Sequence, residues 1–546
     1  TTALGGSNQM MQQPGLAITA LAVWSVITAC SSSGANPAEA ATGSTTEPDG
    51  TSETTESKGG TSTTIAGGSG GKRSASTLGG RSSAAGGNGG TRSATVGGKS
   101  STLQGGQGNL GGSSDASGGS GTSAELAKSQ CAGNPGPSYD DFFDNQKLAT
   151  LRITIDAADL GGKTAMDVLW AKKSHCEPFS YTKAKFDYES SDGAGDVSCA
   201  NVGMRLRGSR GTESNQIQGF KLDLQVLDTT ATVHRRFADL NRINVLSIEG
   251  DKSHMIQCLA YKAMRDFGIP APRCNHLKVY LNDKYYGLVE NVEQVNRGYV
   301  RRHFGSNEGF LFAASPSMDT CGFKDSLAKL NYSGDSFSSY TAQYLLDSAT
   351  AADAEATLIP MLKCGDATQT PDEAKFKACI AEWIDVEEWL KVIAAESLMP
   401  ELESWIGFYR NYYLYFNPDA SAPHSGRFVA WVWDLDTAYQ RNSCFPSSCD
   451  PFTSVDSLYG PRNARSKFVT RLTAAFKNQY CTQLKDFLSK VYSTSLVDDM
   501  ARVIESGISG DASVSAAEWQ AEVSTIRNYI SKHKAEAQST VNAACP

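Results

Sequence analysis

A long segment without aromatic residues limits which part of this chain can fold. Residues 31–130 consist mainly of Gly, Ser, Thr and Ala, with few aliphatic side chains. Such a segment cannot bury enough apolar surface to offset the conformational entropy that ordering would cost. The sequence therefore predicts a disordered Gly/Ser/Thr-rich linker over 31–130 and a folded region over 131–546.

The residues before the linker have the pattern of an export signal. An apolar run over Leu16–Ala29 is too short to cross a bilayer comfortably, and it ends in small residues before Cys30. This pattern predicts a lipoprotein signal peptide over 1–30, with an upstream extension before the true start, and a lipid anchor on Cys30. Ordinary secretion is the alternative, because no Lys or Arg precedes the apolar run. The protein is then a bacterial outer-membrane or cell-surface lipoprotein, otherwise a secreted protein, and meets the membrane only through the lipid.

Cysteine usage also favours an extracytoplasmic protein. Twelve of the thirteen cysteines lie in the folded region, and an even number suits disulfide formation in an oxidising compartment. Buried free thiols are the alternative. The pairing does not follow from the sequence, although two pairs are close enough to close small loops: Cys364 with Cys379, and Cys444 with Cys449.

The charge distribution excludes one class of partner. The formal net charge is −8, and the Lys and Arg residues are scattered along the chain. Proteins that bind duplex nucleic acid usually carry a basic face. We therefore expect no nucleic-acid partner, which leaves room for a local basic pocket that binds phosphate.

Hydrophobic periodicity predicts an α+β fold. Alternating or apolar segments predict strands, with Asn282-Asp283 as the turn of a hairpin, at 148–156, 201–207, 220–226, 276–295, 412–416 and 427–433. Apolar spacing typical of helices occurs at 252–267, 374–399 and from 466 to the end. Strands first and helices later indicate a mixed or antiparallel sheet core with a C-terminal helical lobe.

Two aspartates form the clearest chemical signal. Asp434 and Asp436 are two residues apart, so in an extended segment both face one side while Leu435 packs inward. Two such carboxylates suit Mg²⁺ that bridges nucleotide phosphates. A solvated acidic turn, or Asp434 as a helix cap, is the alternative.

A basic pair precedes them in the chain. Arg205 and Arg207 share a face of their predicted strand, and a guanidinium fork fits a phosphate or a carboxylate. Gly208 and Gly211 would let the following loop approach a ligand closely. Salt bridges to surface acids are the alternative.

Several blocks together resemble the CotH (spore coat protein H) family of atypical, secreted protein kinases. They are RLRGSRG followed by FKLDL, the run NRINVLSIEGDKSHMIQCLAYKAMRDFGIPAPRCNHLKVYLNDKYYGLVENVEQV, and NYYLYFNP followed by WVWDLDTAY. The resemblance covers about 139–540. It implies an atypical protein-kinase-like fold, ATP with Mg²⁺ or Mn²⁺ as cofactors, and phosphoryl transfer to protein Ser/Thr.

The resemblance also implies roles for single residues. Lys221 matches the lysine that contacts the α/β phosphates, and Glu293 matches the carboxylate that holds this lysine. Asn411 matches an asparagine that holds a second metal ion or a loop backbone. An exposed strand lysine and a hydrogen-bonded core amide are the respective alternatives for Lys221 and Asn411.

Two departures from the family pattern bear on catalysis. The family has an aspartate shortly before the asparagine-aromatic strand, and this chain has Glu401 and Glu403 there. We expect Glu403 or Glu401 to substitute, with one more methylene of reach. The family often has an aromatic residue followed by lysine where this chain has Phe312-Ala313.

Three functions follow from these residues. The first is an extracytoplasmic kinase with a protein substrate. The second is a catalytically weak or inactive surface-anchored binding module, an adhesin or scaffold with a cell-surface partner, on the same fold. The third is a phosphotransferase that acts on glycans or small molecules.

Overall fold

The structure, a computed structural model, describes most of the chain from residue 131 onward. The described residues are 131, 136–173, 179–193, 195–207, 217–227, 235–246, 251–314, 318–319, 322–323, 328–399, 409–419, 421, 423–439, 466–509, 511 and 514–545. Several predictions fall outside them: the signal peptide with Cys30, the linker, Gly208 and Gly211, Glu401 and Glu403, and the pair Cys444 and Cys449.

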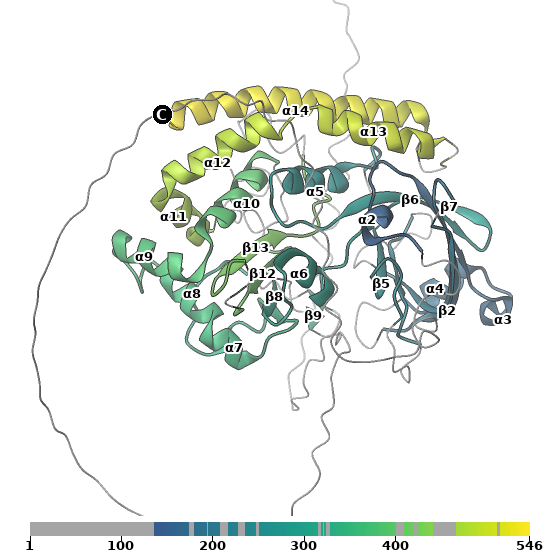
Figure 1. Ribbon diagram of the computed structural model, residues 1–546, viewed down its shortest axis with the longest axis horizontal. Helices are drawn as coiled ribbons and strands as arrows, with labels where there is room; N and C mark the ends of the chain where they lie inside the picture. Colours follow the sequence, from purple (N-terminus) through teal and green to yellow (C-terminus); the bar gives the residue numbers. More distant parts are fainter. Residues whose placement is uncertain are drawn as a thin grey trace, which may run out of the picture. The chain divides into compact units, whose positions relative to one another are not determined.

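Strands and helices alternate along the first half of the described chain, and helices dominate the second half (Figure 1). The strands are β1 (Ala149–Thr154), β2 (Thr182–Glu189), β3 (Val197–Leu206), β4 (Phe220–Asp223), β5 (Arg242–Leu246), β6 (Cys274–Leu281), β7 (Lys284–Val292), β8 (Phe310–Ala314), β9 (Met318–Asp319), β10 (Gly322–Phe323), β11 (Leu345–Leu346), β12 (Tyr412–Phe416) and β13 (Phe428–Val432). The helices are α2 (Tyr139–Phe142), α3 (Ala157–Leu160), α4 (Ala165–Ala171), α5 (Ile256–Asp266), α6 (Arg297–Phe304), the 3₁₀ helix η2 (Phe337–Ser339), α7 (Ala351–Ala356), α8 (Leu358–Gly365), α9 (Glu373–Trp383), α10 (Val386–Leu398), α11 (Lys467–Ala475), α12 (Lys477–Lys490), α13 (Ser495–Ile508) and α14 (Ala516–Ala544).

Seven strands close into a barrel in the order β1-β2-β3-β4-β5-β7-β6. Neighbouring strands run antiparallel, except that β1 and β6 run parallel. Side chains alternate across each strand, and Leu151, Phe220 and Val245 belong to the hydrophobic cluster inside the barrel. Phe142 and Phe186 pack edge-on against Phe237 in the same cluster. The residues between these apolar positions therefore point out of the barrel.

The hairpin of β6 and β7 forms as predicted. Asn282 and Asp283 both have positive φ, 48° and 64°, which is the backbone of a tight two-residue turn. The Asn282 amide also binds the end of β1, accepting from Ile155 N at 3.1 Å and donating to Ile155 O at 2.7 Å. Gly287 has a φ of 151°, and a Cβ there would collide with Ile217, so glycine is required.

A second sheet, in the order β11-β8-β12-β13, lies between two helices. On one face, Trp431 and Tyr415 pack with Tyr299 and Phe304 of α6. On the other face, β13 contacts α10, where Trp389 Nε1 donates to the Phe428 carbonyl at 2.9 Å. A small sheet of β9 and β10 stands apart from it.

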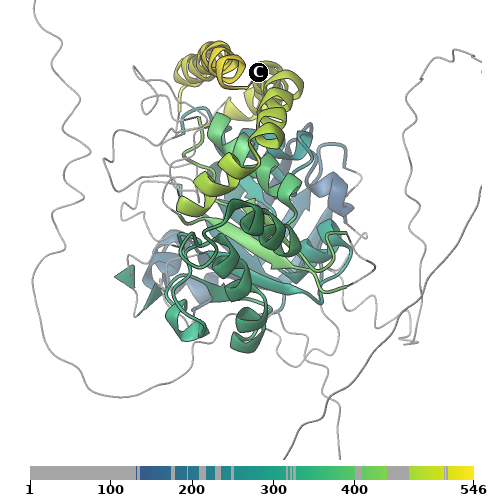
Figure 2. The same cartoon turned by 90° about the vertical axis from the view of Figure 1, so that its left-hand side faces the viewer.

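The helices form the remaining part of the core. Helix α5 begins where Asp251 Oδ2 accepts from the backbone N–H groups of Met255 and Ile256, at 2.9 and 2.8 Å. It ends before Gly268, which has a φ of 82° and follows directly on the predicted helical range 252–267. Helices α13 and α14 lie side by side, and α13 also contacts α5 (Figures 1 and 2). The mixed α and β content, with helices toward the C-terminus, confirms that part of the predicted fold class.

Disulfides join distant parts of the described chain. Four are present: Cys131–Cys199, Cys258–Cys274, Cys364–Cys379 and Cys481–Cys545. They confirm the prediction of disulfides and the expected small loop between Cys364 and Cys379. None of the described helices is both long enough and apolar enough to cross a membrane.

Candidate functional site

Three polar side chains lie side by side on the outer face of β3, β4 and β5. Lys221 pairs directly with Arg205 on one side and with Asn244 on the other, and direct partners on antiparallel strands project from the same face. Their chain neighbours Leu222 and Ile243 belong to the barrel interior. Lys221 and Asn244 are only 5% and 1% exposed although they point outward. We call these three residues the β3–β5 row.

Arg205 and Arg207 share a face, as predicted, but their surroundings differ. The Arg205 guanidinium stacks 3.8 Å from the centre of the Phe179 ring, and its Nε donates to the Tyr181 hydroxyl at 3.2 Å. Arg207 instead donates from Nη1 to Oδ1 of Asn244. The aromatic side chains thus hold Arg205, whereas Arg207 is joined to the β5 end of the row.

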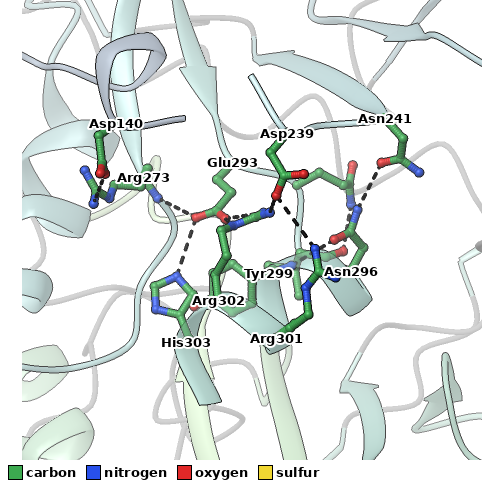
Figure 3. Close-up of polar contacts among 12 residues, drawn as sticks. Asp140, Asp239, Asn241, Arg273, Glu293, Asn296, Tyr299, Arg301, Arg302 and His303 are labelled. Carbon is green, nitrogen blue, oxygen red and sulfur yellow. Dashed lines mark hydrogen bonds and ion pairs between the residues drawn. The ribbon is translucent and has the colours of Figure 1, made fainter. Parts of the chain in front are cut away.

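Glu293 belongs to a buried ion-pair network (Figure 3). Arg302 donates to its Oε1 from Nε and Nη2, at 3.1 and 2.7 Å, and His303 Nε2 lies 3.6 Å from its Oε2. Burial raises the pKa of Glu293, but the adjacent His303 and Arg302 outweigh it and lower that pKa below its usual value. Since Arg302 makes the shorter contacts and always carries its charge, we regard it as the main partner. Through this contact, Glu293 connects α6 to the end of β7.

The same network reaches two other segments of the barrel. Arg273 donates from its backbone N to Glu293 Oε2 at 3.2 Å, and its guanidinium pairs with Asp140 of α2 at 2.7 Å (Figure 3). Asp239, before β5, lies 3.7 Å from Arg301 and 3.6 Å from Arg302. These outer pairs are partly exposed and contribute little by themselves, but they surround the buried Glu293–Arg302 contact.

The resemblance implied that Glu293 pairs with Lys221. In the structure, Glu293 pairs with Arg302. Glu290 pairs with Leu246 of β5, two residues from Asn244, so Glu290 shares the outer face with Lys221. Glu293 stands three residues further along, and an odd step places it toward the opposite face. Within the described strands β5 and β7, Glu290 is therefore a carboxylate on the face of Lys221.

Glu290 is buried inside the protein, and its pKa is raised. It is 2% exposed, and its two oxygens accept from Gln257 Nε2 at 2.9 Å and from Cys258 N at 3.3 Å. Burial raises the pKa of Glu290 to about 8; the Gln257 hydrogen bond opposes that rise, and the charges of Asp251 and Asp436 add to it.

One group of possible metal ligands lies at the same place but does not fit a metal ion. Ligand atoms of Cys258, His276 and Glu290 lie within 4.8 Å of one another. Cys258 is bonded to Cys274, and the ligand that metals take from cysteine is a free thiolate. We therefore assign no metal to this group.

The segment after β13 turns instead of staying extended. The strand ends at Val432, and Asp434 has a φ of 60°. Asp434 and Asp436 thus lie on a turn, which corrects the expectation that an extended backbone points both to one side. Leu435 is buried, as predicted. A non-glycine residue with positive φ is uncommon and often marks a functional site.

Asn411 stands beside this turn at the start of β12. Its carbonyl accepts from Trp433 N at 2.7 Å, and its own φ is 59°. Its amide Nδ2 is buried and has no hydrogen-bond partner among the described residues. An amide can be placed with either its oxygen or its nitrogen inward, and an inward oxygen would suit Mg²⁺ or Mn²⁺ together with the oxygens of Asp434 and Asp436. By their chemistry, the three side chains offer oxygen ligands of the kind that Mg²⁺ or Mn²⁺ prefers.

Hydrogen bonds connect this turn to Glu290. The Asp434 N–H donates to the Tyr261 hydroxyl at 2.9 Å, and that hydroxyl donates to Gln257 Oε1 at 3.4 Å. Gln257 in turn donates to Glu290. Helix α5 thus links the turn after β13 to the outer face of β7.

Tyr413 of β12 responds to charges from the turn and from the barrel. Burial raises the pKa of Tyr413, the carboxylates of Asp347 and Asp434 raise it further, and the positive charge of Arg207 lowers it. The opposite residue on β8 is Ala313, where the family often has lysine.

The residues singled out from the sequence lie in three places. Asn411, Asp434 and Asp436 lie next to β12 and β13, and Arg207 and Lys221 lie on the barrel face. Arg205 is held by Phe179 and Tyr181, and Glu293 belongs to the α6 network. Sequence reasoning missed Asn244, Gln257, Tyr261 and Glu290. A signal existed only for Asn244, which is polar between the apolar Ile243 and Val245 of its strand.

Comparison with known proteins agrees with this arrangement. No curated protein matches the chain. The family model described as CotH kinase protein matches residues 204–536, which is more than half of the chain and includes every candidate site residue from Arg205 to Asp436. The chain belongs to the CotH kinase protein family.

Proposed function

We propose that the protein is an extracytoplasmic kinase that transfers phosphate from ATP to Ser or Thr hydroxyls of a protein, with Mg²⁺ or Mn²⁺ as cofactor. The observation that carries the proposal is the position of Asp434. Its N–H is hydrogen-bonded to Tyr261, which is linked through Gln257 to Glu290 on the face of the barrel that also carries Lys221. This connection supports a site where carboxylates for a metal ion lie near cations for phosphates, as phosphoryl transfer requires.

The family resemblance and the geometry together suggest the role of each residue. Asp434, Asp436 and Asn411 would hold the metal ion, which neutralises charge on the triphosphate. Lys221 and Arg207 would contact the phosphates. Arg205, which stacks on Phe179, would stabilise this face of the barrel.

The proposed reaction is an in-line displacement. The substrate hydroxyl oxygen bonds to the γ-phosphorus while the bond from this phosphorus to the β,γ-bridging oxygen breaks, and ADP leaves with that electron pair. The hydroxyl proton passes to a carboxylate, for which Glu403 or Glu401 is the candidate from the sequence. On this proposal the barrel and the helical part correspond to the two lobes of an atypical kinase-like fold.

The proposed location is outside the cytoplasm. Its support is the set of four disulfides, which persist in oxidising compartments. We propose that Cys30 is lipidated, and that residues 31–130 tether the folded region of 131–546 to the membrane.

A binding module on the same fold is the second candidate. Two features of the chain favour it: glutamates at 401 and 403 where the family has aspartate, and Ala313 where the family often has lysine. Displacement of a catalytic group by about 1 Å can cost about a hundredfold in rate.

A phosphate-transfer assay separates the two candidates. The purified protein is incubated with γ-labelled ATP, Mg²⁺ and a generic protein substrate, with Lys221→Met as the control variant. We expect label on Ser or Thr and formation of ADP, both lost in the control. A folded protein that transfers no label to any Ser/Thr substrate or to itself would favour the binding module.

A further inference from the structure

We propose that Arg207 and Asn244 form an oxyanion seat on the outer face of the barrel, and that Nδ2 of Asn244 donates a hydrogen bond to a phosphate oxygen of a polyphosphate chain. The inference rests on the proposed function and extends it, because it names a binding residue and the part of the ligand that it recognises.

The first observation is the side chain of Asn244. It is 1% exposed and lies on β5 directly opposite Lys221. Its Oδ1 accepts from Arg207, but its Nδ2 is buried without a hydrogen-bond partner among the described residues. Buried polar groups are nearly always paired, and a buried donor left unpaired is costly. A ligand that supplies an acceptor would remove this cost.

The second observation is the chemistry of the neighbours. The guanidinium of Arg207 and the ammonium of Lys221 can only donate hydrogen bonds, and both carry positive charge. The oxygen of Asn244 is already used by Arg207, so its amide also contributes only a donor. Groups of this kind together select a ligand with several acceptors and negative charge.

The third observation is the position of the seat. Asn244 and Leu246 are two residues apart on β5, and Leu246 pairs with Glu290, which is hydrogen-bonded through Gln257 and Tyr261 to the N–H of Asp434. This series of contacts connects the seat to the acidic turn. A monoanion such as a carboxylate would occupy only the seat. A polyphosphate can place one phosphate on Asn244 and present another to a cation held by Asp434, which favours a polyphosphate chain.

Two substitutions test the role of Asn244. Asn244→Asp keeps the size of the side chain and the acceptor for Arg207, but it replaces the donor with a carboxylate oxygen. Asn244→Ala removes the donor without adding charge. The matched control is Asn417→Asp: Asn417 is also 1% exposed and its Oδ1 accepts from Asp419 N at 3.1 Å, but it lies at the opposite end of β12 from Asn411.

The experiment measures the affinity of the full chain for inorganic tripolyphosphate, ATP and adenosine, with thermal melting as the folding control. We expect Asn244→Ala to weaken tripolyphosphate and ATP by about tenfold or more, the usual range for a hydrogen bond to a charged group. We expect Asn244→Asp to abolish binding of both, and Asn417→Asp to leave both unchanged. Adenosine should not distinguish the variants.

The outcomes separate this inference from the proposed function. Tripolyphosphate binding that depends on Asn244, in a protein that transfers no phosphate, would support the seat and contradict the kinase. Phosphate transfer with wild-type affinities in both Asn244 variants would overturn the seat and leave the kinase intact. Failure of the folded wild-type protein to bind tripolyphosphate would also overturn the seat.

Discussion

The carboxyl of Glu290 should make the protein less stable as the pH rises, and the substitution Glu290→Gln should abolish this pH dependence. Burial raises the pKa of Glu290 from 4.5 to about 8 in the folded protein. Between these values the folded state holds a proton that the unfolded state has released. The free energy of unfolding therefore falls with rising pH across this window. The contribution of Glu290 is fully present below about pH 4.5 and is lost above about pH 8.

The size of the effect follows from the width of the window. A difference of about 3.5 pH units, at about 1.36 kcal/mol per unit, corresponds to roughly 5 kcal/mol. Most of this change falls between pH 5 and pH 8. Gln resembles the neutral acid in shape and keeps one acceptor for Gln257 Nε2 or Cys258 N, so the variant should fold.

The assay is urea denaturation of the wild-type protein and of Glu290→Gln at a series of pH values, without reductant so that the disulfides stay intact. Taking the difference between the two proteins removes the titration of all other groups. We expect the variant to gain stability relative to the wild type by several kcal/mol between pH 5 and pH 8. Parallel curves across this range would refute the assignment of Glu290 as a buried neutral acid.

Three further predictions concern other parts of the structure. Glu293→Gln should destabilise the protein by about 3–5 kcal/mol in urea denaturation, because it leaves the Arg302 guanidinium without its carboxylate; a change below about 1 kcal/mol would contradict the proposed connection of α6 to β7. Tyr261→Phe removes the acceptor for the Asp434 N–H, so we expect a lower melting temperature and weaker Mg²⁺-ATP binding by calorimetry, and unchanged binding would show that Tyr261 does not position Asp434. Limited proteolysis should leave a stable fragment that begins between about residues 125 and 140, and a stable core that retains residues 40 to 110 would disprove the linker.

Elements determined by local sequence could be predicted. The β6–β7 hairpin follows from Asn282-Asp283, and the end of α5 follows from Gly268, because both depend on the φ values that a few residues adopt. The pattern of alternation likewise located β1 and β12. The closure of the barrel could not be predicted, since the parallel pairing of β1 with β6 joins segments more than 100 residues apart.

The candidate site was predictable only in part, for a related reason. The sequence identified Lys221 and Asn411 through their resemblance to a family pattern, and Asp434 through its spacing from Asp436. The choice between Glu290 and Glu293 depends on which face of β7 each side chain occupies, and this requires the register of β5 against β7. Similarly, no local signal predicted the positive φ of Asp434, whose N–H contacts Tyr261 on a helix distant in sequence.

The central claim is that Asp434 holds the metal ion of a nucleotide site, and calorimetry with ATP and Mg²⁺ on the wild-type protein and on Asp434→Asn tests it most directly. Asn keeps the shape of the side chain and tolerates positive φ, so the backbone of the turn should survive while the charge that binds the cation is lost. We predict that the wild-type protein binds ATP only with Mg²⁺ or Mn²⁺ and that Asp434→Asn loses most of this binding without a change in folding. Equal affinity in both proteins, or no nucleotide binding by a folded wild-type protein, would contradict the claim.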